Sequence, residues 1–325
     1  MILFKKGLFI MALVLVAGLA QAQTVDVSST IKEGIRLNSE KNYAAAIEKY
    51  KEALAAEPDN AQANYQLAFS LNASGKGTEA IPYLNKVIKT GSDLTGPAYE
   101  LMGSIYDTAH QPQQAIDAYK EGIKLKPDYQ PLYFNLGIAY FRAQKYAEAE
   151  LAAIEAINLD PKHANSQRLY GLVTFHQNKR VPALMGLCSF LLLDPEGPRA
   201  DEAYTNLQSL LKGGDLKAAK ADPETLMLNK TLGTSVAASG SQLDSQLKNI
   251  FTAVGKLGEK TGKQSFFWNY YAAFFYKLSQ SPHFPTAVKL IGLSADKTGG
   301  AAWLQSNADK RKALDEWIAS AERKF

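Results

Sequence analysis

Cysteine and histidine are both scarce in this 325-residue chain, which contains one cysteine and four histidines. A single thiol cannot form an intramolecular disulfide or a multi-cysteine zinc site. The histidines are His110, His163, His176 and His283, and none has a second histidine at metal-ligand spacing. We therefore predict no metal site and no cofactor, and we expect His110, His163 and His283 to be solvated loop residues.

Motifs that bind nucleotides or carry out acyl transfer are also missing. The sequence has no Gly-x-x-x-x-Gly-Lys-Ser/Thr loop, no Gly-x-Gly-x-x-Gly turn and no Gly-x-Ser-x-Gly elbow. Cys188 lies among leucines on one helical face, which favours a buried structural thiol over a nucleophile. The sequence therefore predicts no catalytic residue and no enzyme activity.

Neither sign of charge is in large excess. The formal net charge is +4, with 21% charged and 46% hydrophobic residues, which is typical of a folded soluble protein. A nucleic-acid-binding protein usually concentrates basic residues on one face, and no basic run is present here. We therefore expect no nucleic-acid partner.

Residues 1–22 have the anatomy of a secretory signal peptide. Lys5 and Lys6 precede an almost entirely apolar run from Gly7 to Leu19, and small residues lie just before a cleavage point at Gln23. The apolar run is shorter than the roughly 20 residues of a membrane-spanning helix, which disfavours a retained anchor. The sequence predicts a periplasmic or otherwise exported protein without a transmembrane span after cleavage, which lowers its formal charge from +4 to +2.

A period of about 34 residues runs through the first half of the chain. Each unit has a small residue followed twelve positions later by alanine. The small residues are Gly34, Ala68, Gly103, Gly137 and Gly171, and the alanines are Ala46, Ala80, Ala115, Ala149 and Ala183. Four units add a proline twelve residues further on, at Pro58, Pro127, Pro161 and Pro195. Small residues let two helices cross closely and proline ends the second one, so the period predicts stacked helix hairpins.

This pattern resembles the tetratricopeptide repeat (TPR) family. The units that fit are 27–60, 61–95, 96–129, 130–163 and 164–197, about half of the chain. The resemblance implies an all-α solenoid whose concave groove is lined by the first helix of each hairpin. It also implies a non-catalytic scaffold that binds a protein or peptide partner.

The residues that the resemblance assigns to the concave groove are here called the inner positions. They are Ile31, Ile35 and Asn38; Tyr65, Phe69 and Asn72; Glu100, Ser104 and Asp107; Phe134, Ile138 and Phe141; and Arg168, Leu172 and Phe175, with Arg142 at the edge. From these the candidate partner-binding residues are Tyr65, Phe69, Asn72, Glu100, Asp107, Phe134, Phe141, Arg142, Arg168 and Phe175. Family members that clamp acidic tails carry Lys and Asn on their first helices, and Ile31 and Ile35 depart from that pattern. The alternative is that several of these side chains only pack against a neighbouring hairpin or the C-terminal region.

The second half of the chain is predicted to be helical without a clear repeat. Residues 198–240 are interpreted as a degenerate repeat followed by a loop over about 220–241, and residues 241–325 as a helical C-terminal domain or cap. Within that domain we expect one helix over about 242–257, ended by Gly255 and Gly258, and a single charged helix over 301–325.

Residues 266–276 contain eight aromatic residues in eleven. The favoured interpretation is a central core helix that is apolar all round, and the alternative is a surface for a partner, for lipid or for self-association. A further hypothesis treats the C-terminal domain as a hydrolytic or ligand-binding module carried by the repeats.

Overall fold

The computed structural model describes residues 26–212 and 222–321, and every regular element in these ranges is a helix. The predicted all-α fold is therefore confirmed. The predicted signal peptide, residues 1–22, lies outside the described residues. The helices belong to two compact units, one ending at Gln111 and one beginning at Pro112.

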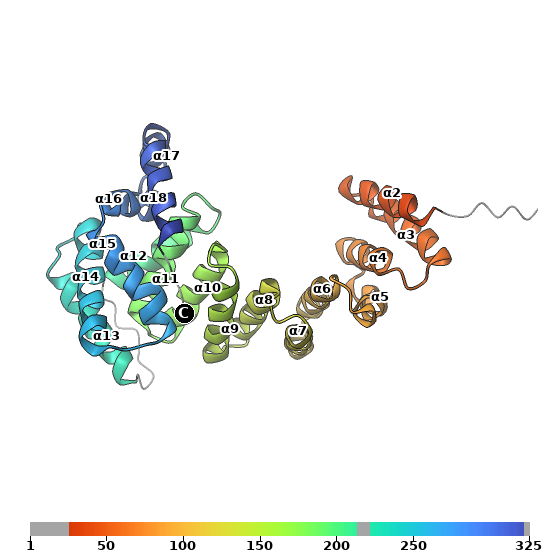
Figure 1. Ribbon diagram of the computed structural model, residues 1–325, viewed down its shortest axis with the longest axis horizontal. Helices are drawn as coiled ribbons and strands as arrows, with labels where there is room; N and C mark the ends of the chain where they lie inside the picture. The colour runs from red at the N-terminus through yellow and green to blue at the C-terminus, as the bar shows by residue number, and fades with distance from the viewer. Residues whose placement is uncertain (1–25, 213–221, 322–325) are drawn as a thin grey trace, which may run out of the picture. The chain divides into compact units, whose positions relative to one another are not determined.

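The first unit consists of two helix hairpins and one further helix (Figure 1). Its helices are α2 (Val27–Ser39), α3 (Tyr43–Ala56), α4 (Ala61–Ala73), α5 (Gly77–Thr90) and α6 (Thr95–Thr108). The Asn42 and Asn60 side chains accept hydrogen bonds from the first turns of α3 and α4. These caps satisfy backbone N–H groups that have no partner inside the helix, so they fix where each helix begins.

Small residues lie where the helices of a hairpin cross. A Cβ atom on Gly34 would overlap the ring of Tyr50, which crosses it on α3 and is completely buried. Ala46, Ala68 and Ala80 are also completely buried. The sequence motif therefore reports close helix packing in this unit, with the Tyr50 ring filling the space that glycine leaves.

The turn inside each hairpin repeats one unusual backbone conformation. Lys41, Gly75, His110, Gln144 and Asn178 have positive φ angles between 57° and 83°. Side chains disfavour this left-handed region, and only Gly75 avoids the penalty. The repeat thus extends to a backbone feature that the small-residue motif did not reveal.

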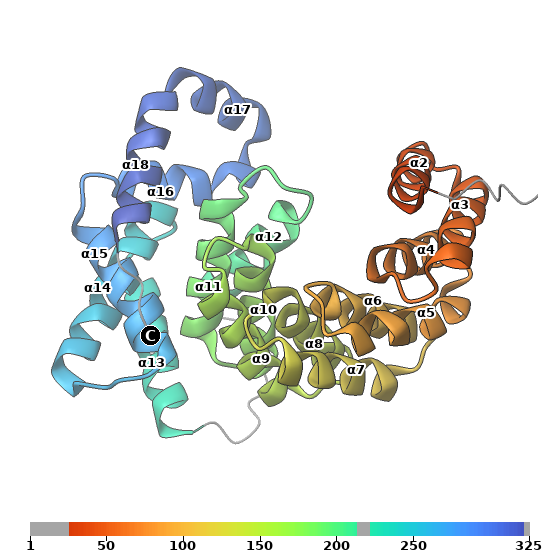
Figure 2. The same cartoon turned by 45° about the vertical axis from the view of Figure 1, so that its right-hand side comes forward.

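The second unit begins with helices that stack in sequence order (Figures 1 and 2). They are α7 (Pro112–Leu125), α8 (Gln130–Arg142), α9 (Tyr146–Leu159), α10 (Ala164–His176), α11 (Arg180–Leu193) and α12 (Ala200–Leu211). A Cβ on Gly137 would lie 2.8 Å from Cδ2 of Leu169, and one on Gly171 would lie 3.0 Å from Leu187. Because α12 packs against α11, it takes the place of the first helix of a sixth hairpin.

Helix α11 is the most enclosed element of the second unit. Twelve of its fourteen residues are buried, because it lies against α10 on one side and against α12, α13 and α16 elsewhere. Its sequence is correspondingly apolar all round. From the sequence, an all-round apolar core helix was predicted only for the aromatic segment, residues 266–276.

The remaining helices form the rest of the second unit. They are α13 (Pro223–Ala237), α14 (Leu243–Thr261), the π-helix η1 (Phe267–Ala272), α15 (Ala273–Gln280), α16 (Phe284–Ile291), the 3-10 helix η2 (Leu293–Ala295), α17 (Lys297–Ser306) and α18 (Ala308–Ser320).

The predicted loop over 220–241 is wrong, because α13 occupies most of that range. Asp222 caps α13 by accepting a hydrogen bond from the backbone of Thr225, and Pro223 is compatible with the first helical position. Leu228 and Leu232 then bury one side of the helix.

Two other boundaries also differ from prediction. Helix α14 runs through Gly255 and Gly258 and ends at Gly262, whose φ of 59° suits a glycine cap. The predicted single helix over 301–325 is broken at Asn307, which has a non-helical backbone between α17 and α18.

The aromatic segment lies in the core, as its favoured interpretation predicted. Seven of its eight aromatic side chains are buried: Phe266, Phe267, Trp268, Tyr270, Tyr271, Phe274 and Phe275. These seven side chains pack inside one chain, and self-association stays an untested alternative.

Candidate functional site

The inner positions of α2 and α4 include exposed apolar side chains. Ile35 is 36% exposed and Phe69 is 44% exposed, although both are large and apolar. They occupy equivalent positions 34 residues apart, on helices that contact each other. Neighbouring first helices thus expose large apolar side chains at equivalent positions, and exposed apolar groups that lie together are typical of interaction sites.

Polar inner positions join these two helices. The Ser70 hydroxyl donates a hydrogen bond of 3.0 Å to Oδ1 of Asn38, which ties α4 to α2. Asn72 is half-buried on α4. Tyr65 is half-buried on the same helix, and burial together with the negative charge of Glu100 raises its phenol pKa. Amide and hydroxyl groups therefore flank the exposed Ile35 and Phe69 side chains.

The other two predicted residues of the first unit lie on α6. Glu100 and Asp107 are both half-buried there. Tyr65, Phe69, Asn72, Glu100 and Asp107 thus belong to one unit. The other five predicted residues belong to the second unit.

Aromatic inner positions of the second unit pack against one another. The Phe134 ring lies edge-on to the His163 ring, with 4.9 Å between the ring centres. The centre of the Phe141 ring lies 5.7 Å from that of Tyr146 and 5.1 Å from that of His176. Phe175 also contacts the His176 ring. Phe134, Phe141 and Phe175 are only half-buried, and they pack against the core of this unit. These contacts agree with the alternative that such side chains pack against a neighbouring hairpin or the C-terminal region.

Arg168 is held by the helix that follows its hairpin. Its guanidinium lies 3.4 Å from Glu202 on α12, and its side chain is only 15% exposed. Burial lowers the pKa of Arg168, while the Glu202 carboxylate opposes that shift. Arg142, by contrast, is exposed at the end of α8.

His163 and His283 differ from the prediction of solvated loop residues. His163 begins α10 and is half-buried, with its Nδ1 atom 2.8 Å from the Ser166 hydroxyl and 3.1 Å from Nε2 of Gln130. His283 is half-buried with its ring centre 6.0 Å from that of Trp317. Only His110 is exposed as expected. Neighbouring helices cover the other two, which local sequence does not reveal.

Gln167 joins the repeat helices to the aromatic segment. Its completely buried amide donates hydrogen bonds to the Tyr270 hydroxyl at 2.8 Å and to the Pro161 carbonyl at 3.0 Å, and it accepts one from the Tyr271 hydroxyl at 2.5 Å. A buried amide needs such partners. This cluster fixes α10 against η1 and leaves no free group for chemistry.

Cys188 is completely buried in α11, as predicted. Burial raises the pKa of its thiol, so it stays protonated at neutral pH. A nucleophilic thiol needs a lowered pKa and solvent access, and Cys188 has neither.

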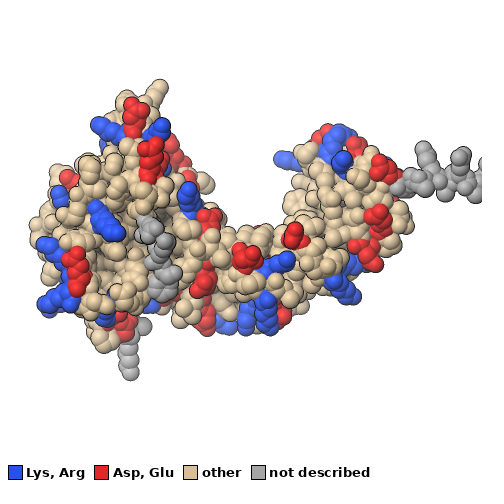
Figure 3. Space-filling view, in the orientation of Figure 1, with Lys and Arg blue, Asp and Glu red and all other residues tan. Residues whose placement is uncertain are grey.

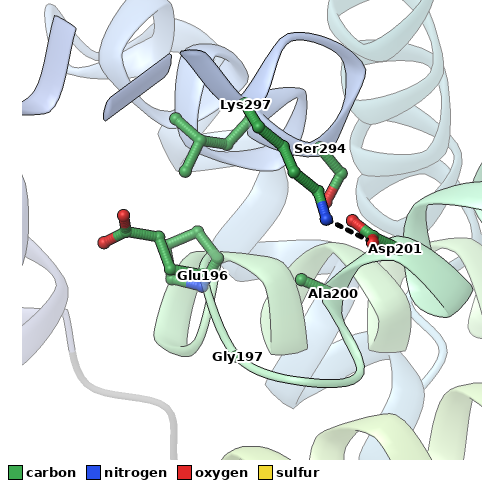
Figure 4. A pocket seen from close by; sticks show the side chains of 8 residues that line it. Glu196, Gly197, Ala200, Asp201, Ser294 and Lys297 are labelled. Carbon is green, nitrogen blue, oxygen red and sulfur yellow. Dashed lines mark hydrogen bonds and ion pairs between the residues drawn. The ribbon is translucent and has the colours of Figure 1, made fainter. Parts of the chain in front are cut away.

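The second unit has several pockets. A small one of about 180 Å³ lies beside the beginning of α12, where Lys297 pairs with Asp201 at 2.5 Å (Figure 4). A cleft of about 430 Å³, lined by α9 and α13, was not anticipated from the sequence, since α13 itself was missed. The sequence signal for α13 is its Asp-Pro-Glu start, Asp222 to Glu224.

Metal-binding and membrane-spanning features are not found in the described ranges. No group of three or more His, Cys, Asp or Glu side chains there could hold a metal ion. None of the helices within residues 26–212 and 222–321 is long and apolar enough to cross a membrane. On the face shown in Figure 3, basic and acidic side chains are intermixed.

Comparisons with known proteins identify repeats in the first half of the chain. Residues 37–104 and 131–163 match models described as tetratricopeptide repeat, and residues 111–144 match a model described as TPR repeat. No curated protein matches the chain.

Solved structures similar to this chain include a tetratricopeptide repeat protein from Parabacteroides merdae. The two sequences are 16% identical, the match covers 82% of this chain and 98% of that one, and the TM-score is 0.47. PilF of Pseudomonas aeruginosa is 17% identical over 57% of this chain and 89% of its own, with a TM-score of 0.45. YrrB, described as a TPR protein with an unusual peptide-binding site, is 20% identical over 55% of this chain and 92% of its own, with a TM-score of 0.45.

Proposed function

Because this chain is a tetratricopeptide repeat protein, and hence of a class of protein-interaction scaffolds, we propose that the inner positions of its first unit bind a partner segment outside the cytosol. The observation that supports this most directly is the exposure of Ile35 and Phe69 on adjacent first helices. Full burial of a large apolar side chain is worth about 1.5–3 kcal/mol, and Ile35 and Phe69, at 36% and 44% exposure, forgo part of that energy. A partner that covers both side chains recovers part of that energy.

The partner that fits this surface is an extended or helical segment with apolar side chains. Asn38 and Asn72 lie 34 residues apart on the same two helices, so their amides are placed to hydrogen-bond the backbone of a segment running across both. The apolar side chains supply buried area and the amides set the register. Carboxylate clamping is not proposed, since Ile31 and Ile35 replace the basic residues that it needs.

The proposed role is non-catalytic and belongs to the cell envelope. Support for export is the signal-peptide pattern of residues 1–22. Support for a binding role without chemistry is the set of buried, hydrogen-bonded polar groups around Gln167 and the protonated, enclosed Cys188 thiol. Holding a partner during envelope assembly or secretion fits both features.

A paired-variant capture experiment tests this function. The mature protein, tagged at its C-terminus, is used as bait for chemically crosslinked envelope proteins. We expect the Ile35→Ser, Phe69→Ala double variant to lose a discrete partner that the wild-type protein retains. Leu159→Ala is the matched control, because Leu159 is also a large exposed apolar residue but lies outside the inner positions. Equal recovery from the double variant and the wild type, with unchanged far-UV circular dichroism, would contradict the proposal.

A further inference from the structure

A cleft of about 430 Å³ lies in the second unit, and none of the inner positions lines it. One wall is the outer side of α9, which carries Glu150, Leu151 and Glu155, and the other is the beginning of α13, which carries Glu224. All of these residues belong to the second unit. A cleft of this volume can hold one or two side chains of a partner.

The lining of the cleft includes a tyrosine whose hydroxyl is not hydrogen-bonded within the described chain. Tyr170 is 1% exposed and lines the cleft, and its ring stacks on that of Tyr271 at 4.9 Å. The Tyr170 hydroxyl forms no hydrogen bond to any group in the described part of the chain. Unlike the Tyr50 hydroxyl, the Tyr170 hydroxyl is not fully enclosed, so it reaches the cleft and can hydrogen-bond an occupant there.

Carboxylates lie on both walls of the cleft, with Glu150 on α9 and Glu224 on α13. Burial raises the pKa of Tyr170 well above its usual value, and the negative charges of Glu150 and Glu224 raise it further. Glu155 and Asp222 also line the cleft, so four carboxylates surround the opening.

Two lysines only partly balance these charges. Lys179 pairs with Glu150 at 2.5 Å and Lys263 pairs with Glu224 at 2.6 Å. The cleft therefore keeps a surplus of negative charge around an unpaired hydroxyl, which favours a positively charged occupant.

The rim of the cleft is apolar. Leu151 is 66% exposed, the largest exposure among the large hydrophobic side chains of the described ranges. Ile154, one turn further along α9, is half-buried and also lines the cleft. The cleft thus combines a charged interior with an apolar edge, which suits a long basic side chain that carries an aliphatic stem.

We propose that this cleft binds a lysine or arginine side chain presented by an apolar segment of a partner protein. The cationic group donates hydrogen bonds to the Tyr170 hydroxyl and to the surrounding carboxylates. The stem and the flanking apolar residues of the partner cover Leu151 and Ile154. This surface is separate from the inner positions of the first unit, and its occupation does not depend on the function proposed for them.

A pair of probe peptides tests the proposal on the full mature chain. The first probe is fluorescein-labelled Gly-Leu-Lys-Leu-Gly-amide, and the second carries norleucine in place of lysine. Binding is measured by fluorescence anisotropy. We expect the lysine peptide to bind about tenfold more tightly, since a charged hydrogen bond is made only by that probe. Equal affinities for the two probes, or no binding of the lysine probe by the wild type, would overturn the proposal.

Variants of the cleft locate the binding. Tyr170→Phe removes only the unpaired hydroxyl, so the fold is retained, and we expect the affinity for the lysine probe to fall about tenfold. Glu155→Gln is expected to weaken binding, whereas Glu148→Gln, also exposed on α9 but outside the cleft, is expected to leave it unchanged. Leu151→Ala and Leu125→Ala form a second such pair, with Leu125 as the control.

Two further outcomes would contradict this assignment. Unchanged affinity in Tyr170→Phe, Glu155→Gln and Leu151→Ala together would show that the probe binds elsewhere. Displacement of the probe by an equal concentration of n-butylamine would assign the cleft to free amines rather than to a protein segment. The Ile35→Ser, Phe69→Ala variant separates the two proposals, because it is expected to bind the lysine probe as the wild type does.

Discussion

The stacked pair Tyr170 and Tyr271 offers a test of how hydrogen bonding stabilises the second unit. Both side chains are almost completely buried and their rings stack at 4.9 Å. Only the Tyr271 hydroxyl is bonded, donating to Oε1 of Gln167 at 2.5 Å. Replacing each tyrosine by phenylalanine therefore removes one hydroxyl from the same stacked ring pair. The Tyr271 hydroxyl is hydrogen-bonded within the chain, whereas the Tyr170 hydroxyl is not.

The expected magnitudes differ clearly. Tyr271→Phe leaves Oε1 of Gln167 buried without a donor, which costs about 1–3 kcal/mol of unfolding free energy. Tyr170→Phe removes a hydroxyl that has no partner within the chain, so its effect is expected to lie near zero or to be slightly stabilising. Stacking and apolar burial are kept in both variants.

Urea unfolding followed by labelling of the Cys188 thiol measures this difference. Cys188 is completely buried in α11, so its reactivity reports the opening of the second unit. We expect the Tyr271→Phe midpoint to fall with an unchanged m-value, because the surface exposed on unfolding stays the same. Equal losses in the two variants would refute the hydrogen-bond assignment around Gln167.

Three further predictions concern packing, pH and processing. Gly34→Ala is expected to lower the unfolding free energy by about 1–3 kcal/mol in a urea titration, because the new Cβ overlaps the Tyr50 ring. The control Gly233→Ala has no atom within 4 Å of the new Cβ and lies at an exposed position inside α13, so it is expected to stabilise by about 0.5–1 kcal/mol. Burial lowers the pKa of His163 despite the opposing charge of Asp160, so the unfolded chain binds more protons and stability is expected to fall as pH drops below about 6.5. His163→Asn should flatten that dependence in urea titrations at pH 5–8, and an equally steep dependence would contradict this assignment. Intact mass spectrometry of the exported protein is expected to show a first residue of Gln23, and retention of residues 1–22 would contradict the signal-peptide prediction.

Much of the repeat architecture could be predicted because its signal is local and periodic. Gly34, Gly137 and Gly171 leave room for a crossing helix or its side chains, and that requirement recurs every 34 residues or so. The enclosure of α11 and the burial of His163 could not be predicted in this way. Both depend on which distant helices pack against them.

The C-terminal region was less predictable for two different reasons. The beginning of α13 has a readable signal, since Asp222 caps the helix and Pro223 suits its first turn, yet the small residues after Ala237 suggested a loop. The cleft beside it has no sequence signal, because Tyr170 and Glu224 are more than fifty residues apart in the chain. The exposure of Phe69 is likewise a property of the packed helices rather than of the local sequence.

Site-specific photocrosslinking at position 69 tests the central claim most directly. A benzophenone amino acid is placed at Phe69 in one protein and at Leu159 in another, and cells expressing each protein are irradiated. We expect a discrete protein adduct from position 69 and none of the same mass from position 159. The same adduct from both positions, or no adduct from position 69, would contradict the claim that the inner positions of the first unit bind a protein partner.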